Sequence, residues 1–157
     1  MTISASRRPE LDRWLLGYSV LLSVTDTTEF QFLASWVTER GGVAIRVADG
    51  RDVKKSLSSH NHNRLLFMLE VPMGDGFSTV RQACLEARAA AALASIVLLT
   101  RSVADEARYA ALREISDAVL AVPVLKSAFE EAILQLTQRT EEGWRPEEGG
   151  GRLPRGA

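Results

Sequence analysis

The chain has 157 residues, of which 46% are hydrophobic and 25% are charged, and its formal net charge at pH 7 is −1. This size and composition are typical of one globular domain with a buried core, and they exclude a strongly basic nucleic-acid-binding protein. The single cysteine, Cys84, excludes an internal disulfide framework. No apolar run reaches the roughly 20 residues that span a bilayer, and the N-terminus lacks the pattern of a secretory signal. We therefore expect a cytoplasmic domain that does not insert into a membrane and does not bind nucleic acid.

The chain opens with a segment that contains one helix-like stretch. Residues 9–16, PELDRWLL, begin with proline at a position typical of a first helical residue, and Leu11, Trp14 and Leu15 fall on one side of the stretch. We predict that residues 1–18 form a leading segment whose short helix packs on the domain or on something before it.

The middle of the chain, residues 19–139, alternates apolar runs with helix-like segments. Val, Ile and Leu fill the apolar runs almost continuously, as in strands that are buried on both faces of a parallel sheet. The predicted strands cover 19–24, 43–47, 64–69, 95–100 and 118–122. The predicted helices cover 28–40, 50–59, 77–92, 103–114 and 124–138. This alternation predicts an α/β fold of the flavodoxin-like (βα)5 type, a doubly wound parallel sheet with strand order 2-1-3-4-5 and its functional crevice at the carboxyl ends of the first and third strands.

The composition changes from residue 140 onward. The sequence TEEGWRPEEGGGRLPRGA is rich in Gly, Pro and charge, and it offers only Trp144 and Leu153 for burial. We predict that residues 140–157 form a flexible linker or tail.

One turn carries a more specific signal than the strand pattern. The run NRLLFMLEVPMGDGF, residues 63–77, leads from a predicted strand into a turn that holds Pro72 and the pair Asp75-Gly76. Three other positions fit the same comparison: Asp26 after the first strand, Thr100 at the end of the fourth, and Val122-Pro123 at the end of the fifth. Over about residues 19–138 the chain resembles the receiver domain of two-component response regulators and hybrid histidine kinases.

The resemblance implies a phosphotransfer site with defined parts. Receivers take a phosphoryl group onto an aspartate at the end of the third strand. Two acids after the first strand hold Mg²⁺, a Ser or Thr after the fourth contacts the phosphoryl oxygens, and a Lys after the fifth pairs with the charge. The metal ion and the Lys offset the charge of the transferring group, while the carboxylate is the nucleophile.

Most of these parts are missing when the pattern is carried onto this sequence. Counting back four residues from Pro72 places Met68 at the acceptor position, where a thioether cannot form an acyl phosphate and is a poor partner for Mg²⁺. The other positions become Thr25 and Asp26 for the acidic pair, Thr100 for the hydroxyl, Val122 for the Lys and Val119 for the aromatic residue of the fifth strand. The resemblance therefore implies a degenerate receiver, a pseudo-receiver, that performs no phosphotransfer and needs no cofactor or metal ion.

Three of these assignments have alternatives. Glu70 lies two residues after Met68, on the same side of an extended strand, so a slip of two residues would bring its carboxylate into the site as a fixed mimic of negative charge. The spacing of Pro72 and the Asp-Gly pair favours Met68. Asp26 is equally well placed to cap the following helix, and Thr100 could simply satisfy backbone groups at a strand end.

The remaining reactive residues predict no further site. His60 and His62 lie two residues apart in a polar stretch without a neighbouring Cys or acidic cluster, and Cys84 falls within an Ala-rich helical pattern without a nearby His to activate it. No catalytic triad pattern or phosphate-binding loop is evident, so we expect that the domain is not an enzyme.

We expect the domain to act by binding another protein. Tyr109, predicted to be exposed, would anchor a partner together with Arg108 and Arg113, because Tyr and Arg are enriched at binding hot spots. An ordinary solvated helix, with an Arg101–Asp105 pair, explains the same residues. Degenerate receivers that this chain resembles occur in hybrid sensor histidine kinases, which suggests histidine kinase domains or another receiver as the partner. A stand-alone atypical response regulator is the other setting.

A second hypothesis is a small-ligand sensor on the same fold. Arg101 and Arg108 lie two helical turns apart and roughly on one side, so they could clamp a cyclic dinucleotide or another anion.

Overall fold

A computed structural model describes residues 13–48, 64–72, 77–90, 94–101 and 106–143. Five strands form one sheet in the order β2-β1-β3-β4-β5, and every neighbouring pair is parallel. The strands are β1 (Tyr18–Ser23), β2 (Val43–Arg46), β3 (Arg64–Glu70), β4 (Ser95–Thr100) and β5 (Ala118–Ala121). The predicted flavodoxin-like α/β fold with strand order 2-1-3-4-5 is therefore confirmed.

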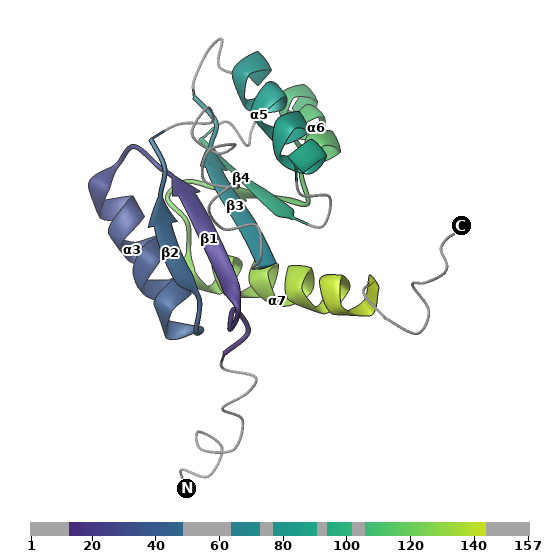
Figure 1. Cartoon of the computed structure of the whole chain (residues 1–157). Helices are drawn as coiled ribbons and strands as arrows, with labels where there is room; N and C mark the ends of the chain where they lie inside the picture. The colour runs from purple at the N-terminus through teal and green to yellow at the C-terminus, as the bar shows by residue number, and fades with distance from the viewer. Residues whose placement is uncertain (1–12, 49–63, 73–76, 91–93, 102–105, 144–157) are drawn as a thin grey trace, which may run out of the picture.

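Helices cover both faces of this sheet (Figure 1). The described helices are α3 (Thr27–Glu39), α5 (Phe77–Ala90), α6 (Glu106–Ile115) and α7 (Lys126–Gly143). The helices α3 and α7 lie on one face, and α5 and α6 lie on the other. The predicted helix at 50–59 falls outside the described residues. Among the helices that are described, none is long and apolar enough to cross a membrane.

The apolar runs form strands because both of their faces are buried. Along β3, Leu65, Phe67 and Leu69 point into the layer beneath α5 and α6. The alternate residues Leu66 and Met68 point into the layer beneath α3 and α7. Each of these five side chains is at most 5% exposed, so β3 contributes to two cores at once.

The folded domain begins before the predicted boundary at residue 18. Of the helix predicted at 9–16, residues 9–12 lie outside the described residues, and the described residues 13–17 form a turn. Leu15 within this turn is fully buried among the residues beneath α3 and α7. The backbone N–H of Leu15 donates to the carbonyl oxygen of Arg40 at 2.9 Å, and the Arg40 guanidinium lies 4.7 Å from the centre of the Trp14 ring. A Cβ atom at Gly42 would lie 3.0 Å from that of Leu15, so a glycine there permits this close packing.

The predicted boundary at residue 139 also falls inside folded structure. Helix α7 was expected to end at residue 138, but it continues to Gly143. Its buried residues, among them Phe129, Ile133 and Leu136, hold it against the sheet. The rest of the predicted tail, 144–157, lies outside the described residues.

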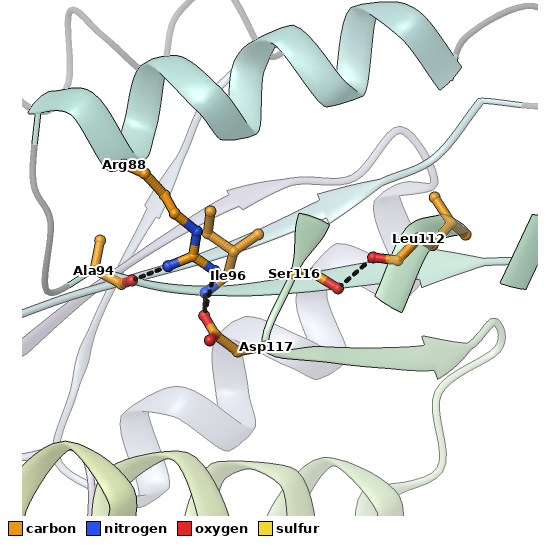
Figure 2. A network of polar contacts seen from close by, with 6 residues as sticks. All are labelled: Arg88, Ala94, Ile96, Leu112, Ser116 and Asp117. Atoms are coloured by element: carbon orange, nitrogen blue, oxygen red, sulfur yellow. Dashed lines mark hydrogen bonds and ion pairs between the residues drawn. The ribbon is translucent and has the colours of Figure 1, made fainter. Parts of the chain in front are cut away.

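Asp117 lies between α6 and β5, at the amino-terminal edge of the sheet, and bonds to two other elements (Figure 2). Its Oδ2 atom accepts a hydrogen bond from the backbone N–H of Ile96, at the start of β4, at 2.8 Å. The same oxygen accepts from Nη2 of Arg88 at 3.0 Å, and Nη1 of Arg88 lies 3.4 Å from the carbonyl oxygen of Ala94. One carboxylate therefore joins α5, β4 and the start of β5.

We expect the substitution Asp117→Ala to lower the free energy of unfolding by about 1–3 kcal/mol, because the Ile96 N–H loses its acceptor inside the protein. The matched control is Arg88→Met, which keeps much of the apolar stem of a side chain that is 38% exposed and should cost below about 1 kcal/mol. Urea unfolding followed by circular dichroism measures both values. A loss as large for Arg88→Met as for Asp117→Ala would show that the ion pair, rather than the backbone bond, carries the effect.

Candidate functional site

A pocket of about 360 Å³ opens at the carboxyl edge of the sheet, where β1 and β3 end beside α5. The chain crosses over in opposite directions from these two strands, and this is the place where doubly wound sheets bind ligands. Among the described residues, its lining combines apolar walls, hydroxyl groups and one pair of opposite charges. The described residues that line it are Ser23, Thr25, Ala48, Leu69, Glu70, Val71, Pro72, Thr79, Val80, Ala83 and Arg101.

Glu70 is the charged residue at the end of β3. Its Oε1 atom accepts two hydrogen bonds from Thr25, one from the backbone N–H at 3.0 Å and one from the hydroxyl at 2.9 Å. Its Oε2 atom lies 3.7 Å from Nη2 of Arg101, an ion-pair distance that is too long for a hydrogen bond. The Glu70 side chain is 15% exposed. The strand-end carboxylate is thus already bound to the loop after β1.

Met68 does not lie in this pocket. Its side chain is fully buried in the layer beneath α3 and α7, and its Cα pairs with those of Leu22 in β1 and Val97 in β4. Counting back four residues from Pro72 placed Met68 at the acceptor position, and that assignment stays a prediction. Strand β3 continues two residues beyond Met68, to Glu70, and the carboxylate of Glu70 lies at the pocket. Glu70, the alternative considered for this site, has its carboxylate at the pocket, and its role as a fixed mimic of negative charge stays a prediction.

Two of the other predicted pocket residues, Asp26 and Thr100, make structural contacts. Asp26 is the N-cap of α3, because its Oδ1 atom accepts the backbone N–H of Glu29 at 3.0 Å. Thr100 is buried at the end of β4, and its carbonyl oxygen accepts the N–H of Val122 at 3.0 Å. Of the predicted positions other than Met68, which are Thr25, Asp26, Thr100 and Val122, Thr25 is the one that lines the pocket.

Glu29 makes a long-range contact that the sequence did not predict. Its side chain is buried, and its Oε2 atom accepts the backbone N–H of Val124 at 2.9 Å. This bond ties the first turn of α3 to the segment after β5, next to the cis bond between Val122 and Pro123. The spacing of Asp26 and Glu29 matches a capping box, which marks Glu29 as a polar contact at the helix start. It does not indicate that the carboxylate reaches across the domain.

The α6 residues that were expected to bind a partner are only partly exposed. Arg113 is exposed, whereas Tyr109 is half-buried, so the expectation of an exposed Tyr109 is wrong. Arg108 is half-buried too, and its Nη2 atom donates to the carbonyl oxygen of Pro72 at 3.0 Å. Asp105, the suggested partner of Arg101, lies outside the described residues. An anion held by Arg101 would also face the Glu70 carboxylate, which argues against the predicted anion clamp.

The remaining candidates give no reactive centre in the part of the chain that the structure describes. There, no group of three or more His, Cys, Asp and Glu residues could hold a metal ion. His60 and His62 fall outside those residues. Cys84 is a buried free thiol, and burial raises its pKa to about 11, with Arg88 lowering and Asp117 raising it. Its thiol therefore stays protonated near neutral pH and packs as a small apolar group.

Comparisons with known proteins identify the fold but do not give a close relative. No protein-family model matches the chain, and no curated protein matches it. Among solved structures, a response regulator receiver domain protein from Clostridium thermocellum has a TM-score of 0.65 at 13% identity, covering 81% of this chain and 98% of that one. The receiver domain of Francisella response regulator 1452 has a TM-score of 0.60 at 21% identity, covering 78% and 98%.

A similar fold is also found in a solved protein that is not named as a response regulator. A pilus assembly-related protein from Burkholderia pseudomallei has a TM-score of 0.61 at 15% identity, covering 81% of this chain and 92% of that one. Several of the similar structures are receiver domains, and each of them matches most of the chain. The chain has the fold of a response regulator receiver domain.

Proposed function

We propose that this domain is a pseudo-receiver that regulates a two-component signalling protein by direct contact and without phosphotransfer. The observation that carries the proposal is the state of Glu70. A receiver gains negative charge at the end of its third strand when it is phosphorylated. Here a carboxylate lies at that strand end permanently, bonded to Thr25 and facing Arg101.

Glu70 is poorly suited to be the acceptor itself. Its Oε1 atom accepts two hydrogen bonds from Thr25, and its Oε2 atom faces the Arg101 guanidinium, so the carboxylate is held in place by the loop after β1 and by an ion pair. Phosphoryl transfer also needs cations around the transferring group. Asp26, the retained acid of the predicted metal pair, is used as the cap of α3. Val122 stands where the receivers have a Lys, and the described lysine nearest in sequence, Lys126, pairs with Glu39 at 3.0 Å.

The proposed partner is a protein of the same signalling system, either the histidine kinase domains or another receiver. A hybrid sensor histidine kinase is the setting we favour, and a stand-alone atypical response regulator is the alternative. The contact surface would include α6, where Arg113 is exposed, and the edge strand β5. We propose a cytoplasmic location, a compartment in which the free thiol of Cys84 stays reduced.

Sensing of an anion such as a cyclic dinucleotide is less well supported. Arg101 faces Glu70 at 3.7 Å, and Arg108 donates to the Pro72 carbonyl. An incoming anion would have to break or share these contacts and would meet the charge of Glu70 at close range.

The proposal predicts that incubation with acetyl phosphate and Mg²⁺ leaves the intact mass of the protein unchanged. The variant Glu70→Asp should also stay unmodified, because it restores the acceptor type but neither the second metal-binding acid nor the Lys. Intact-protein mass spectrometry reads out both, with a phosphorylatable receiver domain in the same mixture as the positive control. A phosphoryl adduct on a carboxylate of the wild-type protein would refute the pseudo-receiver proposal. An adduct on Glu70→Asp alone would show that only the acceptor had been lost.

A second prediction concerns the metal ion. Titration with Mg²⁺ should produce no saturable amide shifts around Asp26 in ¹⁵N-edited NMR spectra, because its carboxylate caps α3 and Glu70 faces a guanidinium. The comparison sample is Asp26→Asn, which preserves a cap but removes the charge. Saturable shifts in the millimolar range that disappear in Asp26→Asn would restore a metal-binding role for this edge.

A further inference from the structure

In the pocket at the end of β3, one of the two carboxylate oxygens of Glu70 takes no part in the contact with Thr25. The two carboxylate oxygens of Glu70 lie in different environments. Oε1 is held by Thr25, whereas Oε2 accepts no hydrogen bond from the described residues and lies 3.7 Å from Nη2 of Arg101. A hydrogen-bond acceptor and a set of guanidinium donors thus stand side by side at the pocket without being bonded to each other.

The charges of this pair restrict the ligand. An anion would be attracted by Arg101 and repelled by Glu70, and a cation would experience the reverse, so neither gains much from the pair. A neutral group with one N–H and one C=O next to each other satisfies both, because it can donate to Oε2 and accept from Nη2. Hydrogen bonds to charged groups are the stronger class, so both would favour such a ligand.

The walls of the pocket restrict the ligand further. Leu69, Val71, Val80 and Ala83 are buried members of the core beneath α5 and α6, and they present an apolar surface to the pocket. A volume of about 360 Å³ lies at the lower end of the range for small-molecule sites. A compact ring with apolar faces fits such a space better than an extended chain.

We propose that this pocket binds a small neutral heterocycle through a lactam edge, the adjacent N–H and C=O that hypoxanthine, guanine and uracil share. The N–H donates to Oε2 of Glu70, the C=O accepts from Arg101, and the ring lies against the apolar residues of β3 and α5. The bonds between Oε1 and Thr25 stay in place. The site does not depend on the absence of phosphotransfer, so the mass measurement and the binding measurement can succeed or fail separately.

The test is an NMR titration with inosine, followed through the backbone amides. Inosine carries the lactam edge, and 1-methylinosine is the matched ligand in which a methyl group replaces the required N–H. We expect inosine to give saturable shifts in the millimolar range at Thr25, Glu70, Thr79 and Arg101. We expect 1-methylinosine to bind at least about tenfold more weakly, because one charged acceptor would stay unpaired.

Two protein variants locate the site. Thr79→Phe puts a large side chain at an exposed position that lines the pocket, and it should abolish the inosine shifts. Gln82→Phe adds the same side chain at an exposed position of α5 that does not line the pocket, and it should bind like the wild-type protein. The unliganded spectra of both variants show whether the fold is retained, and the comparison of the two nucleosides needs no variant at all.

Three results would overturn the proposal. The first is an absence of saturable shifts with inosine, and the second is equal binding of inosine and 1-methylinosine. The third is a titration with inorganic phosphate that reproduces the inosine shifts at Glu70 and Arg101, since this would mean that the pocket is an anion site after all.

Discussion

The fixed register of β3 is the constraint on which the crevice depends. This strand is hydrogen-bonded to β1 on one side and β4 on the other, and both of its faces are buried. A shift by one residue would turn Glu70 and Met68 to the opposite face and exchange the two cores. The observed register places Met68 in the core and makes Glu70 the next residue on the same face, at the point where the sheet ends. The carboxylate therefore meets Thr25 and Arg101 at the mouth of the crevice.

The fold was predictable from the sequence because its signals are local. Runs of Val, Ile and Leu separated by helical patterns are typical of a parallel sheet covered on both faces. Each end of the five predicted strands agrees with the structure to within one residue. The position of the site was not predictable in the same way. Pro72 gave a reference point in the sequence, but the number of residues between it and the strand end depends on pairing with β1 and β4. No local pattern contains that information.

The missed contacts share a physical cause. Glu29 bonds to Val124, Arg108 to Pro72 and Glu70 to Thr25, and each bond joins a charged side chain to the backbone of a distant loop. Backbone groups have no residue-specific signal, so a sequence cannot identify them as partners. The half-buried state of Tyr109 is missed for a related reason: it depends on how α6 is rotated against the sheet, and the helical pattern alone leaves that rotation open.

The bonds between Glu70 and Thr25 also bear on the proposed regulatory role. In receivers the charge at the strand end is added and removed, whereas here it belongs to the chain, so in the proposed pseudo-receiver a change of state at this edge would require that Glu70 leave Thr25. Two hydrogen bonds to a charged group, at about 1.5–3 kcal/mol each, oppose this change. Moving an equilibrium from 1:99 to 99:1 needs about 5.5 kcal/mol of differential binding. A ligand that bonds to Oε2 while Oε1 stays bonded to Thr25 would not bind more tightly to the state in which Glu70 has left Thr25. Such a ligand therefore supplies no differential binding energy in favour of that state. Binding in the pocket would therefore stabilise the present arrangement of the edge, and a partner that opposes this state would have to compete for Thr25 itself.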